Sequence, residues 1–151
     1  MAEDAPDAPR GIEMSEQEVE ETLRELGHGT LALASGDEAY GVPVSFGFDG
    51  ERLFLTLLQF GDESKKLTFA DRTETATLTA YETASKFDWR SVIVTGDLQE
   101  VPVDDHDYVE SIMDDNAWFP NLFAPTEAIT AVRRLELSLA DATGRKGVER
   151  R

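Results

Sequence analysis

The chain has 151 residues, 40% of them hydrophobic, and its 31 acidic residues against 14 basic ones give a formal net charge of −17. This length and apolar content fit a single domain with one core. The negative charge argues against nucleic acid and anionic membranes as partners, because both would repel a chain without a concentrated basic face. The sequence contains no apolar run near the roughly 18 residues of a membrane span, and no cysteine for disulfides or thiolate ligands.

The ends of the chain differ from its middle in composition. Residues 1–12 are rich in Pro, Ala and Asp and predict a flexible acidic arm. The arm lacks the apolar segment of a secretory signal, which favours a cytoplasmic protein. A single domain is expected over residues 13–147, with residues 148–151 as a tail. Many acidic residues with few lysines are typical of halophilic proteins, so isolated acidic residues say little about function.

Helix and strand signals alternate in a pattern typical of an antiparallel β protein. Ser15 and Glu18 form a capping box, and the helix that they begin is expected to end at Gly27. Six strands follow from alternating or β-branched runs: Thr30–Ser35, Val42–Phe48, Arg52–Leu58, Thr75–Tyr81, Trp89–Val101 and Val132–Leu139. Asp49-Gly50 predicts a hairpin, and short helices are expected over Ser64–Asp71 and Asp104–Asp115. These elements favour a barrel or sandwich, and the missing G-x-G-x-x-G motif argues against a dinucleotide fold.

Two of the four lysines, Lys65 and Lys66, stand together where the second helix begins. The N-terminus of a helix offers unpaired N–H groups and the positive end of the dipole, so added cations favour an anion such as a phosphate. The alternative is that the pair only relieves local acidic repulsion.

The strand Val42–Phe48 has one bulky face and one face of small residues, the latter being Gly41, Pro43, Ser45 and Gly47. Glycine inside a strand often marks close approach of a ligand or of another backbone. A bound flat ligand and a subunit contact both remain open, and a cofactor at a dimer interface would satisfy both.

Other candidate residues give weaker signals. Trp89 and Ser91 share a strand face and can offer an aromatic wall and a hydroxyl to a heteroaromatic ring, although a lone Trp is more often a core residue. His28 and His106 lack metal-ligand spacing, and no catalytic side chain is indicated. The segment 118–123 predicts a lid or a dimer contact, and the basic cluster 143–147 predicts a tail or an arm that reaches the cofactor.

The ordered motifs resemble a known family. Gly-His-Gly-Thr-Leu-Ala, Val-Pro-Val-Ser-Phe, Leu-Phe-Leu-Thr, Ser-Lys-Lys and Trp-Arg-Ser-Val-Ile-Val-Thr-Gly follow one another as in the FMN-binding split β-barrel proteins related to pyridoxamine 5′-phosphate oxidase. The chain is most similar to the small, nitroimidazole-reductase-like branch. The resemblance implies a mainly β fold, a six-stranded antiparallel split β-barrel, and a homodimer with two equivalent FMN sites at its interface.

The resemblance also implies a set of cofactor-binding residues: Val42, Pro43, Val44, Ser45, Leu55, Thr56, Ser64, Lys65, Lys66, Trp89 and Ser91. The first four would pass the flavin ring with their backbone, and the next two would lie beside the ring and the ribityl chain. The Ser-Lys-Lys group would grip the phosphate, and the last two would contact the ring from the same or the partner subunit. Lys65 departs from the more usual Arg of the family, which removes a bidentate fork.

The expected function is therefore that of an FMN-binding oxidoreductase acting on a small molecule, with substrate and electron donor undefined. Two alternatives remain open. A deazaflavin coenzyme would make the chain a different kind of reductase, and a non-enzymatic module would bind flavin or another small molecule, or retain no cofactor.

Overall fold

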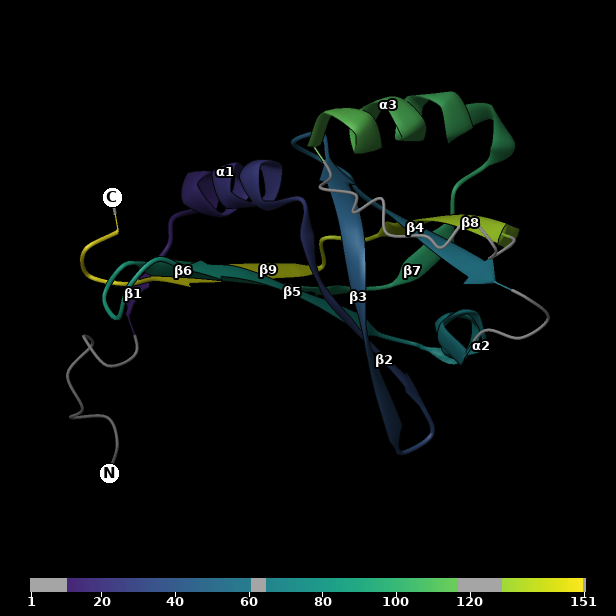
Figure 1. Cartoon of the computed structure of the whole chain (residues 1–151), viewed down its shortest axis with the longest axis horizontal. Helices are drawn as coiled ribbons and strands as arrows, with labels where there is room; N and C mark the ends of the chain where they lie inside the picture. Colours follow the sequence, from purple (N-terminus) through teal and green to yellow (C-terminus); the bar gives the residue numbers. More distant parts are fainter. Residues whose placement is uncertain (1–10, 61–64, 117–128, 151) are drawn as a thin grey trace.

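The structure, a computed structural model, describes residues 11–60, 65–116 and 129–150. Within these residues the strands are β1 (Ile12–Glu13), β2 (His28–Ser35), β3 (Glu38–Phe48), β4 (Leu53–Phe60), β5 (Ala76–Thr83), β6 (Trp89–Gly96), β7 (Leu98–Glu100), β8 (Ile129–Leu137) and β9 (Asp141–Lys146). The helices are α1 (Glu16–Leu26), α2 (Lys65–Arg72), the 3-10 turn η3 (Val103–Asp105) and α3 (His106–Asn116). Antiparallel pairing gives the strand order β1-β9-β6-β5-β2-β3-β4-β8-β7 (Figure 1).

The sheet does not close, and β3 divides it into two halves. The first part of β3 pairs with β2 along its whole length, from Glu38↔Ser35 to Ser45↔His28. Only its last three residues, Phe46–Phe48, pair with β4. One half of the sheet therefore contains β1, β9, β6, β5 and β2, and the other contains β4, β8 and β7. This open arrangement confirms the mainly β, split-barrel architecture predicted from the sequence.

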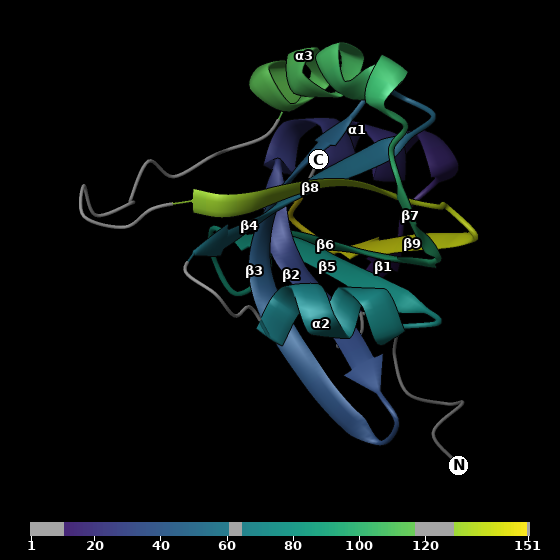
Figure 2. The ribbon, with the colours of Figure 1, turned by 90° about the vertical axis from the view of Figure 1, so that its right-hand side faces the viewer.

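Three helices cover different parts of this sheet. In Figure 1, α1 lies along the half that contains β5, β6 and β9, and α3 lies above β3 and β4. Figure 2 shows α2 on the opposite side of the molecule from α3, next to β2 and β3. The main core fills the space between them and includes the fully buried Leu31, Phe46, Leu55, Leu78 and Val94.

Local chemistry explains why α1 begins and ends where the sequence predicted. The Ser15 hydroxyl accepts a hydrogen bond from the Glu18 backbone N–H at 3.2 Å, and the Ser15 N–H donates to the Glu18 carboxylate at 3.1 Å. These two bonds satisfy donors that a helix start leaves open. Gly27 ends the helix in the left-handed region, at φ 71°, which only glycine adopts without strain.

The sequence-based strand assignment was wrong at the end of the chain. The cluster 143–147, interpreted there as a tail or an arm, mostly belongs to β9, which pairs with both β6 and β1. The expected strand Trp89–Val101 is also divided into β6 and β7, which lie in different halves of the sheet. Strand β6 ends at Gly96, where the chain passes close to Ser138. Only glycine fits at this position, because an added Cβ would lie 2.0 Å from the Ser138 carbonyl oxygen.

Candidate functional site

The paired lysines at the start of α2 lie against the first part of β3. The Lys65 ammonium is 3.1 Å from a Glu38 carboxylate oxygen and 5.1 Å from the centre of the Tyr40 ring. It also lies 5.4 Å from the centre of the Phe69 ring, one turn further along α2. The first turn of α2 has no acidic residue. The structure therefore brings the predicted phosphate-binding end of α2 next to the strand predicted to pass the ring.

Lys66 is in a different environment from Lys65. The Lys65 side chain is 55% exposed, whereas Lys66 is half-buried. Burial lowers the pKa of the Lys66 ammonium below its ordinary value of 10.5, because the charged form loses hydration. An anion that approached Lys66 would restore part of that lost stabilisation.

The edge of β3 next to these lysines has two properties that suit a flat ligand. Gly41 and Pro43 are exposed, and a Cβ built on Gly41 would meet only the Thr30 methyl, at 3.5 Å. The Phe46 N–H donates towards β2, to the Gly27 carbonyl at 2.9 Å. Because backbone groups alternate along a strand, Gly41 and Pro43 direct theirs to the opposite edge, where β4 does not pair with them. Pro43 is tolerated at this edge because no described neighbouring strand there requires the N–H that proline lacks.

One part of the small-residue pattern has a structural cause instead. At Gly47 an added Cβ would lie 3.1 Å from the backbone of Ile112 in α3. The glycine therefore permits a helix to pack on the strand, and only the part of the pattern before it remains available to a ligand.

Four predicted contact residues of β3 and β4 present little side chain to a ligand. Val42 and Val44 are each 8% exposed, and Leu55 is fully buried between Phe46 and Leu135 on the neighbouring strands. These three can approach a ligand only through their backbone. Thr56 is half-buried and lies opposite Arg134 of β8.

Trp89 and Ser91 lie far from α2 in the same chain. Trp89 pairs with Thr83 at one end of the β5–β6 hairpin, while Ala76 at the other end is the residue that follows α2 into the sheet. Seven residue steps along a strand separate these ends by roughly 23 Å. Trp89 also accepts a hydrogen bond from the Gly147 N–H at 2.8 Å. One chain therefore does not bring its Trp89 to its own Lys65.

Ser64 and the segment 118–123 lie outside the described residues. His28 is exposed at the start of β2, and a ring nitrogen of His106 lies 3.1 Å from the Val101 carbonyl oxygen, so the two histidines have separate structural settings. Among the described residues, no group of His, Asp and Glu is arranged to hold a metal ion.

A surface that the sequence analysis did not single out connects the two ends of this site. We call it the uncharged face. It consists of the outward residues of β2, β3, β5 and β6: His28, Thr30, Ala32, Ala34, Ala39, Gly41, Pro43, Thr77, Thr79, Tyr81, Thr83, Trp89, Ser91, Ile93 and Thr95.

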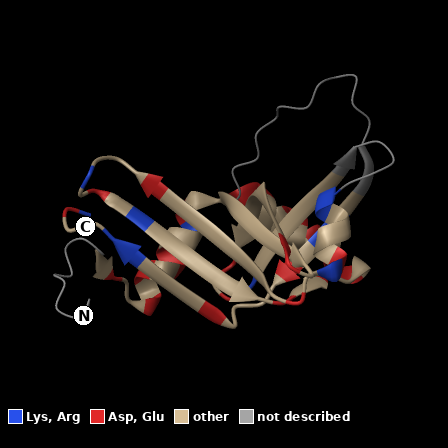
Figure 3. Ribbon diagram, turned by 90° about the horizontal axis from the view of Figure 1, so that it is seen from below, with Lys and Arg blue, Asp and Glu red and all other residues tan. Residues whose placement is uncertain are grey.

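None of these residues is Asp, Glu, Lys or Arg, although these four types make up 30% of the chain. Tyr81 is 64% exposed and Ile93 46%. Figure 3 shows the strands of the sheet half that contains β2, β5 and β6 from below, with Lys, Arg, Asp and Glu mainly towards the strand ends. The sequence already showed uncharged residues at every second position of β5 and β6. Only the pairing register joins these positions into one surface.

Comparison with known sequences identifies the family. The sequence model described as pyridoxamine 5′-phosphate oxidase matches residues 15–146. This match covers nearly all of the described fold, and the chain belongs to the pyridoxamine 5′-phosphate oxidase family. The resemblance inferred from the motifs is thereby confirmed.

Individual relatives add detail about similarity. An uncharacterized protein of Rhizobium meliloti is 30% identical over 89 residues, which are 59% of this chain and only 56% of that protein. A FAD-binding protein from Mesorhizobium loti has a similar structure, with a TM-score of 0.68 at 20% identity over 89% of this chain and 96% of that one. A protein from Bacteroides thetaiotaomicron, named as a candidate for 5-nitroimidazole antibiotic resistance, gives a TM-score of 0.66 at 16% identity over 88% of this chain and 85% of that one.

No described helix is both long and apolar enough to cross a membrane.

Proposed function

We propose that this chain is a flavin-binding oxidoreductase that holds FMN between two copies of itself. The observation that carries the proposal is the contact of Lys65 with Glu38 and Tyr40, because it seats the only paired lysines beside the exposed edge of β3. The residues fit the cofactor: two cations and a helix start suit one phosphate, and an exposed edge with small side chains suits a flat ring.

Lys65 and Lys66 would neutralise the phosphate, and Ser64 would add a hydroxyl by analogy with the family. The backbone of Val42–Ser45 would hold the edge of the ring, with Leu55 and Thr56 beside the ring and the ribityl chain. Bound flavin would supply the electron transfer, and the protein would orient it and control access to it. No side chain is assigned as a catalytic acid or base.

A second copy of the chain would complete the site. Trp89 and Ser91 lie at the far end of the uncharged face, so they would reach a flavin only in the partner's site. A face of Thr, Ala and Gly with exposed Tyr81 and Ile93 suits a subunit interface, because charged groups are depleted at the centre of such contacts. Two equivalent flavins would then lie at one symmetric interface.

The choice among flavins rests on the cations available. FMN has one phosphate, whereas FAD has a pyrophosphate and the deazaflavin coenzyme has a longer acidic tail. The two lysines match the first best. FAD is nonetheless a specific second candidate, because the similar Mesorhizobium loti protein is named FAD-binding.

The first experiment is an absorption spectrum of the protein purified in concentrated salt, before and after addition of FMN, FAD or the deazaflavin coenzyme. Retained or restored bands of an oxidised flavin, identified by chromatography of the released cofactor, would support the proposal. Turnover with NADH or NADPH and an acceptor panel would then distinguish an enzyme from a storage or sensing module. A colourless protein that binds none of the three would refute flavin binding.

A further inference from the structure

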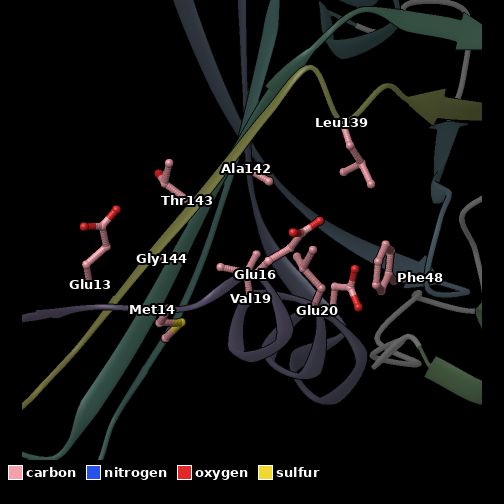
Figure 4. Close-up of a pocket in the computed structure, with 11 residues that line it drawn as sticks. Glu13, Met14, Glu16, Val19, Glu20, Phe48, Leu139, Ala142, Thr143 and Gly144 are labelled. Carbon is pink, nitrogen blue, oxygen red and sulfur yellow. The ribbon is translucent and has the colours of Figure 1, made fainter.

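A pocket lies between α1 and β9, on the other side of the sheet from the uncharged face. It has a volume of about 370 Å³, which lies within the range of small-molecule sites. Its apolar lining comes from α1, the strand ends and the link before β9, and comprises Met14, Val19, Leu23, Phe48, Leu139 and Ala142 (Figure 4). This pocket is separate from the proposed flavin site.

The pocket stays open because β9 has small residues where it passes α1. A Cβ on Gly144 would lie 2.6 Å from the Met14 sulfur, so glycine lets Met14 pack against the strand. Ala142, two residues earlier, points into the pocket in Figure 4 and fills little of it. The volume is thus a consequence of side-chain size on β9.

Carboxylates line the mouth of the pocket. Glu16 and Glu20 of α1, with Val19 and Leu23, occupy one helix face at the spacing i, i+3, i+4 and i+7, and Glu13 adds a third carboxylate from β1. Figure 4 shows the Glu16 and Glu20 side chains extending towards the end of the pocket where Phe48 and Leu139 lie. The pocket is therefore apolar in its interior and negatively charged at its opening.

Within the described part of the chain, these three carboxylates have no cationic partner, unlike Glu18 and Glu25 of α1. Glu18 pairs with Lys146, and Glu25 accepts a hydrogen bond from Arg90 at 2.8 Å. Among the described residues, no side-chain hydrogen bond or ion pair involves the carboxylate of Glu13, Glu16 or Glu20. The dipole explains an acid at Glu16, in the first turn, but not at Glu20. Like charges four residues apart on a helix repel each other, and a cation between them would remove that repulsion.

We propose that this pocket binds a small organic cation with an apolar body, of the aryl-alkyl ammonium class. The apolar body would occupy the space over Met14, Val19 and Phe48, and the ammonium group would lie between Glu16 and Glu20. Apolar burial supplies affinity, and the carboxylates select the positive charge. Arg24, the basic residue near Phe48, does not occupy this position, because its guanidinium donates to the Asp49 carbonyl at 3.2 Å.

The test uses the full chain labelled with ¹³C at its methionine methyl groups. Met14 lines the pocket, while Met113 lies in the separate cluster beneath α3 and serves as an internal control. Phenethylamine is the probe, with 2-phenylethanol and phenylacetate as neutral and anionic analogues. We expect phenethylamine to shift the Met14 signal saturably and leave that of Met113 unchanged. The neutral analogue should bind at least about fivefold more weakly and the anion not detectably.

Three variants separate the contributions. Glu16→Gln with Glu20→Gln should weaken phenethylamine binding roughly five- to tenfold, whereas Glu21→Gln, on the same helix and outside the pocket, should not. Ala142→Leu should abolish binding by filling the pocket without changing any charge. Equal binding of 2-phenylethanol, equal weakening by Glu21→Gln, or no effect of Ala142→Leu would each overturn the proposal. A Met14 signal that never moves would do the same.

Discussion

The two faces of the sheet formed by β2, β5 and β6 differ in both charge and cover. On the face that α1 covers, Arg90 is 8% exposed and bonds to Glu25 at 2.8 Å and to Glu82 at 2.7 Å. On the opposite face the outward residues of β2, β3, β5 and β6 include no Asp, Glu, Lys or Arg, and the described helices leave Tyr81 and Ile93 exposed.

Loss of water has different electrostatic consequences on the two faces. The buried Arg90 on the α1 side already has two acidic partners within the chain, so its burial is compensated. An acidic protein gains solubility from charge on every wet surface, yet the uncharged face has none. This absence is expected of a face that is buried between two copies of the chain.

The largest effect is expected from Ile93→Glu, at the middle of the uncharged face. A symmetric interface would then bury two unpaired carboxylates, and the dissociation constant of the dimer should rise more than about 100-fold. Light scattering after size exclusion should give a dimer for the unchanged chain and a monomer for the variant, with equal circular dichroism. Val103→Glu, at a residue that is 79% exposed outside the face, is the matched control. A monomeric unchanged chain would eliminate the interface altogether.

The second effect concerns the end of the face where α2 begins. Lys65→Ala combined with Lys66→Ala should weaken FMN binding about 100-fold, because two charge-assisted bonds to the phosphate are lost. Fluorescence titration with FMN measures the change. Lys86→Ala removes one of the two other lysines in the chain and should leave affinity unchanged. Lys65→Arg should preserve binding, and stoichiometric FMN in the double variant would show the phosphate assignment to be wrong.

On the covered face, Arg90→Met should reduce stability and not assembly. It removes bonds to Glu25 and Glu82, and we expect a loss of about 2 kcal/mol in the free energy of unfolding. The acidic partners are more than 40% exposed and remain hydrated, which limits the loss. Urea unfolding in concentrated salt measures it, with Arg72→Met, at an exposed position at the end of α2, as control. A change of oligomeric state in Arg90→Met would contradict the separation of roles between the two faces.

The fourth effect follows from the burial of Lys66. The protonated form of Lys66 binds phosphate, and burial lowers the pKa of this ammonium below its ordinary value of 10.5. FMN affinity should therefore decline at pH values below 10.5 as Lys66 loses its proton. The decline should be up to roughly tenfold. Lys66→Arg keeps its charge over this range and should flatten the profile. Parallel profiles for the two proteins would assign the decline to another group.

Local signals allowed much of the fold to be predicted from sequence. The Ser15 and Glu18 capping box and the glycine after Leu26 set the bounds of α1, and alternation identified most strands. Strand β9 was missed because Asp141–Lys146 has no regular alternation and gains its stability from β6 and β1 on either side. Partner strands, which decide such a segment, are not visible along the chain.

The candidate site was less accessible to sequence reasoning because it depends on register. The motif at Lys65 and Lys66 indicated an anion site, but nothing local showed that Glu38 would lie beside it. The uncharged face likewise became one surface only when Thr30 was placed opposite both Pro43 and Thr79. Two-residue periodicity specifies which side a residue faces, and long-range pairing specifies what lies next to it.

The smallest expected effect concerns Glu38, which competes with a phosphate for Lys65. Glu38 lies 3.1 Å from Lys65, and both side chains are more than half exposed, so their pairing is weak. A phosphate must compete with that carboxylate, and Glu38→Gln should tighten FMN binding about threefold at moderate salt and less at high salt. Asp37→Asn, a change of equal charge one residue earlier, should alter affinity less. If both variants tighten binding equally, Lys65 responds only to the net charge of the surface, and the contact with Glu38 has no part in setting affinity.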